Sequence, residues 1–150
     1  MKVYFGTDHA GYELKNTLLA YVEGELGHEV VDCGAYEENP EDDYPAFVRA
    51  AAEAAAKDPH GSRAIVLGGS GEGEAMVANK VPGIRAAVYH GGNLDVVALS
   101  RTHNDANVLS LGARFMKKDE AKEAVRLWLE TPFSGEARHA RRIASIEESS

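Results

Sequence analysis

Short apolar runs alternate with helical segments along this whole chain, and that alternation is what most limits the folds open to it. The apolar runs lie at 2–7, 28–34, 62–69, 82–91 and 106–113. The segments between them carry apolar residues at helical spacing. Runs such as Ala-Ile-Val-Leu (64–67), apolar on both faces, are typical of buried parallel strands. The pattern predicts an α/β fold with a doubly wound sheet of about five parallel strands between two layers of helices.

The size and charge of the chain limit the classes of protein to which it can belong. Its 150 residues suit one domain, 1–150, and can bury a core without a disulfide or a metal. The single cysteine, Cys33, excludes an intrachain disulfide, and we expect a cytoplasmic protein. With 16 basic and 24 acidic residues, the net charge of -8 argues against nucleic acid or a membrane as a partner. A small phosphorylated ligand needs only a few local donors and fits this charge.

Residues 68–74, Gly-Gly-Ser-Gly-Glu-Gly-Glu, form a glycine-rich loop between the third apolar run and a helix. Glu74 stands where a dinucleotide-binding loop needs Gly or Ala, and no Gly-Lys-Ser/Thr closes the loop as in a P-loop. A tight turn with glycines for packing is the simplest structural interpretation. Successive free N–H groups at the start of a helix also suit an oxyanion, which makes this a candidate binding loop.

Two glutamates in the loop, Glu72 and Glu74, sit where the helix dipole favours carboxylates, so both could be simple stabilising caps. Because residues two apart on a helix face different ways, only one of them can point toward a cleft. A carboxylate beside converging amides is suited to moving a proton on a carbon next to a carbonyl. The base takes the proton, and the amides hold the resulting enediolate oxygen.

Other polar residues follow the first and fifth apolar runs. Ligands bind at the carboxyl ends of the strands in an open parallel sheet, and Asp8 and His9 follow the first run. Asp8 is also placed to cap the helix after it. His103 and Asn104 close a helix before the fifth run, and Arg114 follows that run. Because a helix C-terminus favours charged histidine, His103 could be a helix cap and nothing more.

A basic cluster stands out near the end of this acidic chain, at 138–142. Arg138 and Arg142 lie one helical turn apart, so both can reach one dianion with charge-assisted hydrogen bonds. The alternative is an ordinary solvated charged face. No His, Cys and Asp group has the spacing of metal ligands, and we expect neither a metal nor an organic cofactor.

Taken together, the motifs resemble those of the type B ribose-5-phosphate isomerases, a family that includes allose- and galactose-phosphate isomerases. The similar stretches appear in the family's order and cover most of the chain. They are 6–15, 43–45, 68–74, 78–87, 100–114 and 138–142. The resemblance implies a Rossmann-like homodimer, or a tetramer, with active sites shared between chains and the helix at about 136–148 packing on a partner. It also implies interconversion of ribose 5-phosphate and ribulose 5-phosphate through an enediolate.

The resemblance also implies roles for individual residues. Asp8 would contact the sugar during ring opening. His103, with Asn104 beside it, would assist the opening of the furanose ring. Ser70 and the amides of Gly71 and Gly73 would hold the enediolate oxygens. The residues that would bind the phosphate are His9, Arg114, Arg138 and Arg142.

One departure from the family pattern concerns the base. One branch of the family has a cysteine at the position of Gly68, whereas this chain resembles the branch in which a glutamate, here Glu74, takes over. Glu72 ranks second, and as a neighbouring carboxylate we expect it to raise the pKa of Glu74 further. A six-carbon sugar phosphate remains an alternative substrate. A non-catalytic sugar-phosphate-binding module and a dinucleotide-dependent redox enzyme are the alternatives from other classes.

Overall fold

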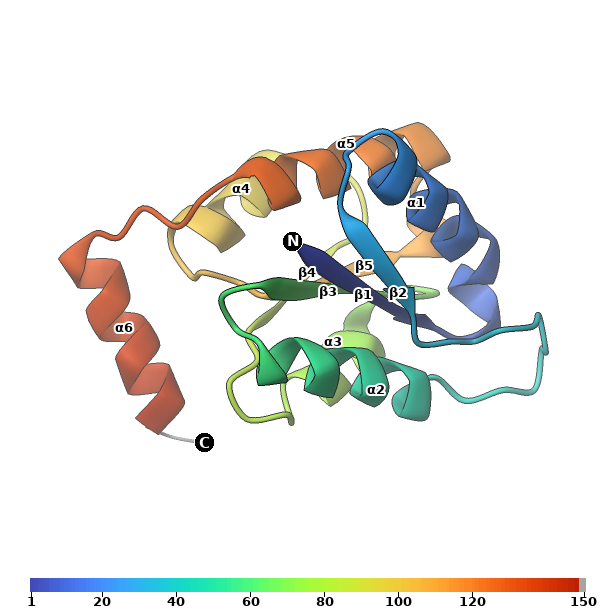
Figure 1. Cartoon of the computed structure of the whole chain (residues 1–150), viewed down its shortest axis with the longest axis horizontal. Coiled ribbons are helices and arrows are strands. Elements are labelled where there is room, and N and C mark those ends of the chain that lie inside the picture. The colour runs from blue at the N-terminus through green and yellow to red at the C-terminus, as the bar shows by residue number, and fades with distance from the viewer. Residues whose placement is uncertain (149–150) are drawn as a thin grey trace.

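The computed structural model describes residues 1–148 and has a five-stranded parallel sheet at its centre (Figure 1). The strands are β1 (Lys2–Thr7), β2 (Glu29–Asp32), β3 (Ser62–Gly68), β4 (Ala86–Tyr89) and β5 (Val108–Gly112). They lie in the order β2-β1-β3-β5-β4, so β3 is central. In one row across the sheet, Ile65 pairs with Phe5 on one side and Leu109 on the other. All carboxyl ends therefore meet at one edge, where a parallel sheet binds its ligands.

Helices cover both faces of the sheet, which confirms the three-layer α/β fold. They are α1 (Tyr12–Gly24), α2 (Tyr44–Lys57), α3 (Glu72–Ala78), α4 (Asp95–Thr102), α5 (Lys118–Glu130) and α6 (Ala137–Glu148). Figure 1 shows α1, α4 and α5 on one face and α2 and α3 on the other. Two 3-10 turns, η1 (His9–Gly11) and η2 (Ala113–Phe115), follow β1 and β5.

The side chains of the central strand, β3, pack into two separate cores, one on each face of the sheet, which explains its continuous apolar run. Ile65 and Leu67 are fully buried among residues of α1 and α5, including Trp128. Ala64 and Val66 are fully buried on the opposite face, against the alanine-rich helix α2. Small side chains on α2 let its backbone lie close to the sheet, so these alanines do more than favour the helix.

Helix α6 stands apart from the layered body (Figure 1). Over Ala137–Glu148 its one buried residue is His139, which is 5% exposed. A helix with so little of its surface covered has little tertiary packing to stabilise it within this chain.

Asp8 caps the helical turn after it, as expected. Its carboxylate accepts a hydrogen bond from the Ala10 N–H (2.9 Å) and caps η1, which leads directly into α1. The α2 helix begins at Tyr44, since Pro45 fits the first turn of a helix. None of the described helices combines the length and apolar character needed to cross a membrane.

Candidate active site

A pocket of about 530 Å³ opens at the carboxyl edge of the sheet, beside the ends of β1, β3 and β5. It brings together six of the residues expected at the site, and Tyr44 and Phe115 add to its wall. The six are Asp8, His9, Ser70, Gly73, Glu74 and Arg114. Segments far apart in sequence meet here because parallel strands end at the same edge.

Glu74 is the buried acid of this pocket. It lies in the first turn of α3 and is 4% exposed. Burial raises the pKa of its carboxyl above the ordinary value, and the nearby Asp8 raises it further. Hydrogen bonds from the backbone N–H groups of Glu74 itself and Gly71 lower the pKa without reversing the shift. A carboxylate with a raised pKa is a better proton acceptor near neutral pH than an exposed one.

Glu72 faces away from the pocket, which confirms that only one of the two loop glutamates points inward. Its side chain is 55% exposed and lies 3.5 Å from Nε2 of His90. The expectation that Glu72 raises the pKa of Glu74 was wrong. Asp8 is the carboxylate that does so, because it reaches the buried acid from the end of β1 while Glu72 extends into solvent.

Gly68, the last residue of β3, makes room for the inward carboxylate. A Cβ atom at Gly68 would overlap the carboxyl group of Glu74. The side chain that the other branch of the family carries at this position and the glutamate of this chain therefore compete for one space. The geometry accounts for the departure noted in the sequence.

The glycine loop between β3 and α3 is fixed by contacts with its neighbours. Gly71 has φ of 84°, a left-handed conformation that suits glycine. Its carbonyl accepts a hydrogen bond from Ser110 Oγ at 2.6 Å, and Ser70 Oγ accepts one from the Glu72 N–H at 3.2 Å. A Cβ at Gly73 would overlap the Tyr44 hydroxyl. The loop is thus held in one conformation before any ligand arrives.

His9 and Arg114 give the pocket a cationic side. The Arg114 N–H donates to the Gly69 carbonyl at 3.1 Å, which ties η2 to the glycine loop. The His9 ring donates through Nδ1 to Oδ1 of Asp42 at 2.7 Å, and this bond raises the pKa of His9. Donor atoms of Asp8, His9 and Asp42 lie within 4.8 Å of one another, a group that could hold a cation. The hydrogen bond between His9 Nδ1 and Asp42 Oδ1 already uses one of these donor atoms from each of the two residues.

The other five expected residues do not line this pocket. Gly71 is the N-cap of α3 within the glycine loop. His103, Asn104, Arg138 and Arg142 belong to the end of α4 and to α6, beyond the amino edge of the sheet. The His103 ring stacks on His139 with 4.1 Å between centroids and 19° between planes. Burial lowers the pKa of His139, and the charge of His103 acts in the same direction.

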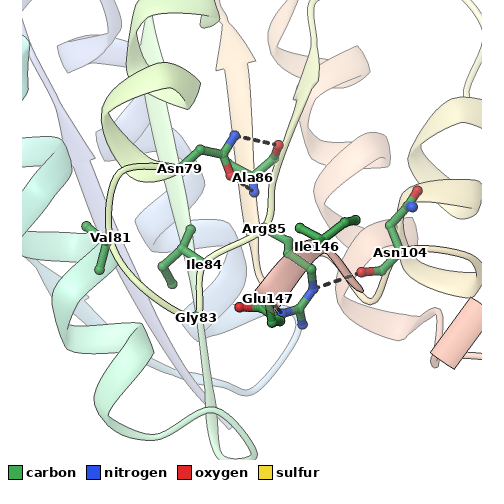
Figure 2. A pocket seen from close by; sticks show the side chains of 9 residues that line it. All are labelled: Asn79, Val81, Gly83, Ile84, Arg85, Ala86, Asn104, Ile146 and Glu147. Carbon is green, nitrogen blue, oxygen red and sulfur yellow. Dashed lines mark hydrogen bonds and ion pairs between the residues drawn. The ribbon is translucent and has the colours of Figure 1, made fainter. Parts of the chain in front are cut away.

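Arg85 connects these two segments (Figure 2). Its guanidinium donates to the Asn104 carbonyl at 3.0 Å and to the Glu147 carboxylate at 2.6 Å. A second pocket of about 450 Å³ lies here, lined by Asn79, Ile146 and their neighbours. Arg85 therefore holds α6 in place relative to the loop that carries His103 and Asn104.

Sequence reasoning missed three residues of these two regions. Tyr44 was noted only as part of a shared stretch, Asp42 was one of several acidic loop residues, and His139 was passed over between arginines. His139 is the single position of its basic cluster that turns inward, and no periodicity over so few residues could distinguish it.

Fold and site together define an α/β protein with a buried proton-accepting carboxylate beside a polar, partly cationic pocket. Residues 3–146 match the model of the family described as Ribose/Galactose Isomerase, and the chain belongs to that family. It is 47% identical over 148 residues to ribose-5-phosphate isomerase B of Mycobacterium tuberculosis (strain ATCC 25618 / H37Rv), covering 99% of this chain and 89% of that protein. It is 37% identical over 145 residues to ribose-5-phosphate isomerase B of Escherichia coli (strain K12), covering 97% and 93%.

The fold is likewise that of a solved member of the family. The crystal structure of ribose-5-phosphate isomerase B from Mycoplasma genitalium with bound ribulose-5-phosphate superposes with a TM-score of 0.93 at 34% identity. The match covers 99% of this chain and 95% of that one. The Rossmann-like α/β fold that the resemblance implied is confirmed.

Proposed function

We propose that this protein is an aldose-ketose isomerase that interconverts ribose 5-phosphate and ribulose 5-phosphate. The observation that carries the proposal is the buried Glu74 carboxylate, with its raised pKa, in the space left by Gly68. The named relatives support the five-carbon substrate over a six-carbon sugar phosphate. A binding module without catalysis would have no use for such a base, and the loop lacks the spacing of a dinucleotide site.

Glu74 acts as the base in this reaction. It removes the proton from C2 of the open-chain sugar and returns it to C1, while the proton of the O2 hydroxyl passes to O1, so no net proton is consumed. The backbone of Gly71 lowers the pKa of Glu74, so its N–H group lies close to this carboxyl. Proton uptake by Glu74 removes the negative charge there when negative charge appears on the substrate oxygen. The amides of Gly71 and Gly73, with Ser70, then hold the enediolate.

The rest of the pocket binds the sugar phosphate. Asp8 is 7% exposed and contacts the sugar while its ring opens. His9 and Arg114 lie on the cationic side and bind the phosphate group with charge-assisted hydrogen bonds. The whole reaction uses proton transfer and oxyanion stabilisation by side chains and amides, and it requires no metal or organic cofactor.

The other expected residues reach a site only across a chain boundary. His103 and Asn104 assist ring opening and Arg138 and Arg142 bind phosphate in the site of a second copy. Supporting this, α6 stands off the body (Figure 1). It is held there by Arg85 and by the stack of His103 on His139. Apolar side chains nearby are exposed, including Met76, Val96, Leu99 and Ile146. We infer one domain over 1–150 that works as a homodimer or tetramer with shared sites.

The experiment that tests the function is a comparison of ribose 5-phosphate and allose 6-phosphate as substrates of the purified protein, with ketose formation as the readout. Glu74→Gln should lower kcat by at least about 10³-fold, within the range for loss of a general base, while sugar-phosphate binding persists. Glu72→Gln is the matched control, since that side chain lies outside the pocket and should leave kcat near the wild-type value. Retained turnover in Glu74→Gln would move the base to another residue. Turnover should also survive a chelator.

A further inference from the structure

Asp42 lies in the acidic loop between β2 and α2 and makes two contacts with one residue of the pocket. Its Oδ1 accepts a hydrogen bond from the His9 backbone N–H at 2.9 Å and a second from His9 Nδ1 at 2.7 Å. The Asp42 side chain is 11% exposed, and the His9 side chain is 28% exposed. One carboxylate oxygen therefore fixes both the main chain and the ring of His9.

These contacts determine how the imidazole meets a ligand. Because Nδ1 donates to Asp42, the opposite nitrogen, Nε2, is left for a group in the pocket. The backbone N–H of His9 donates a second hydrogen bond to Asp42, and this bond restrains rotation of the ring relative to η1. Oδ2 of Asp42 is buried and has no hydrogen-bond partner among residues 1–148. A buried, half-satisfied carboxylate is stabilised by a cation beside it, and His9 is the cation available.

The charges around the ring favour the imidazolium. The hydrogen bond that the His9 ring donates to the Asp42 carboxylate is the largest influence and raises the pKa of His9, with smaller upward contributions from the charges of Asp8 and Asp42. Partial desolvation and the charge of Arg114 lower it. Because the pKa is raised, His9 stays charged to a higher pH than a free histidine and loses its charge as pH rises through the raised value.

We propose that Asp42 is a positioning residue for substrate phosphate, holding the His9 ring oriented and protonated so that its Nε2–H meets the dianion. The inference rests on the proposed function, which places the phosphate at His9 and Arg114. Asp42 touches no substrate atom itself, and it acts only through His9. The acidic loop thereby strengthens the binding of an anion, although its own net charge would repel one.

The test is the pH dependence of KM in Asp42→Asn, which keeps the shape of the side chain and removes its charge. At acid pH His9 is protonated in both proteins, and KM for ribose 5-phosphate should be close to wild type. Toward alkaline pH the variant should lose affinity first, with KM about tenfold above wild type near pH 8 and kcat little changed. Glu41→Gln, an exposed neighbour in the same loop, is the matched control and should follow the wild-type profile.

Two further measurements separate this role from a structural one. In a His9→Gln background, Asp42→Asn should add nothing to KM, because its effect passes through the imidazole. NMR titration of the His9 ring, with and without inorganic phosphate, should show a lower midpoint in Asp42→Asn, and it needs no turnover. An equal rise in KM at every pH, or an unchanged His9 midpoint, would overturn the inference. The wild-type protein could instead form no ketose while the NMR midpoint of His9 is still lower in Asp42→Asn. That result would refute the proposed function.

Discussion

The carboxyl group of Glu74 occupies the space into which a side chain at Gly68 would project. The two residues belong to different elements, the end of β3 and the first turn of α3, and the glycine loop folds one onto the other. A catalytic carboxylate in this position thus depends on a missing Cβ six residues earlier in the chain. The dependence makes a substitution at Gly68 a test of the base.

Gly68→Ala should displace the Glu74 carboxylate and lower kcat by about 10²-fold, at the lower end of what general-base catalysis contributes. The free energy of unfolding should change little, because the new Cβ meets only the end of the Glu74 side chain, which can shift. Steady-state kinetics and denaturant unfolding measure the two effects. Gly24→Ala is the control, since a Cβ there meets nothing within 4 Å and should change neither quantity adversely. Full activity in Gly68→Ala would show that Glu74 need not occupy its observed position.

The acid limb of the pH profile should report the Glu74 carboxyl. Only the ionised carboxylate accepts a proton, so kcat/KM should fall on the acid side at a pH above the ordinary glutamate value of 4.5, because burial raises the pKa. Asp8→Asn removes the nearby negative charge that adds to this shift. The variant should be slower, because we propose that Asp8 contacts the sugar, but its acid limb should move to lower pH. A limb that stays in place would assign it to another group.

The pH dependence of folding stability should also report the Glu74 carboxyl, and its direction follows from the raised pKa. The folded-state pKa of Glu74 is raised, so its contribution to stability is fully present below the unfolded pKa and is lost as pH rises through the folded pKa. At neutral pH the buried charge therefore destabilises the fold. Glu74→Gln should raise Tm at pH 7 to 8, and the gain should shrink at acid pH, where the wild-type carboxyl is protonated. A lower Tm in Glu74→Gln at neutral pH would contradict the pKa shift.

Much of the fold and half of the site follow from local patterns. The continuous apolar run of β3 predicts a strand buried on both faces, and Ile65 and Val66 enter the two cores as that pattern requires. Asp8 and Glu74 could be placed together because parallel strands end at one edge. Helix geometry likewise predicts that only one of Glu72 and Glu74 turns inward, and the resemblance to the family indicated Glu74.

The rest depends on contacts between distant segments. Asp42 meets His9 across 33 residues, and nothing in the acidic loop distinguishes it from its neighbours before the chain is folded. The stack of His103 on His139 likewise depends on where α6 lies. The placement of α6 is set by Arg85, which lies in a stretch similar to the family, 78–87, although nothing in that stretch indicates a contact with Glu147.

Arg85→Met should loosen both α6 and the segment that carries His103. Its guanidinium holds the Asn104 carbonyl and Glu147, so its loss should raise KM for ribose 5-phosphate by about tenfold through misplacement of the phosphate-binding arginines. The fold should persist, since Arg85 side-chain contacts lie outside the two cores. Arg126→Met removes an arginine paired with Glu123 and Glu130 on the exposed face of α5, and it should leave KM unchanged. Equal effects of the two substitutions would refute a specific role for Arg85.

Mixed oligomers test whether the sites are shared between chains. Glu74→Gln removes the proposed base from one side of a site, and His103→Asn removes the residue proposed to assist ring opening from the other side. If the two residues act across a chain boundary, a dimer of one chain of each kind contains one intact site and one doubly altered site. Random association of equal amounts then restores about one quarter of the wild-type activity from two nearly inactive proteins, as a two-fold symmetric assembly requires.

The control for this experiment is a mixture in which both altered residues belong to the pocket of one chain. Glu74→Gln and Asp8→Asn lie in the same pocket, so every dimer formed from them carries one altered residue in each site, and no activity above that of the parents should appear. Purifying the mixed species through two different affinity tags fixes its composition before assay. If Glu74→Gln and His103→Asn also fail to complement each other, then the two residues do not act in one site across a chain boundary.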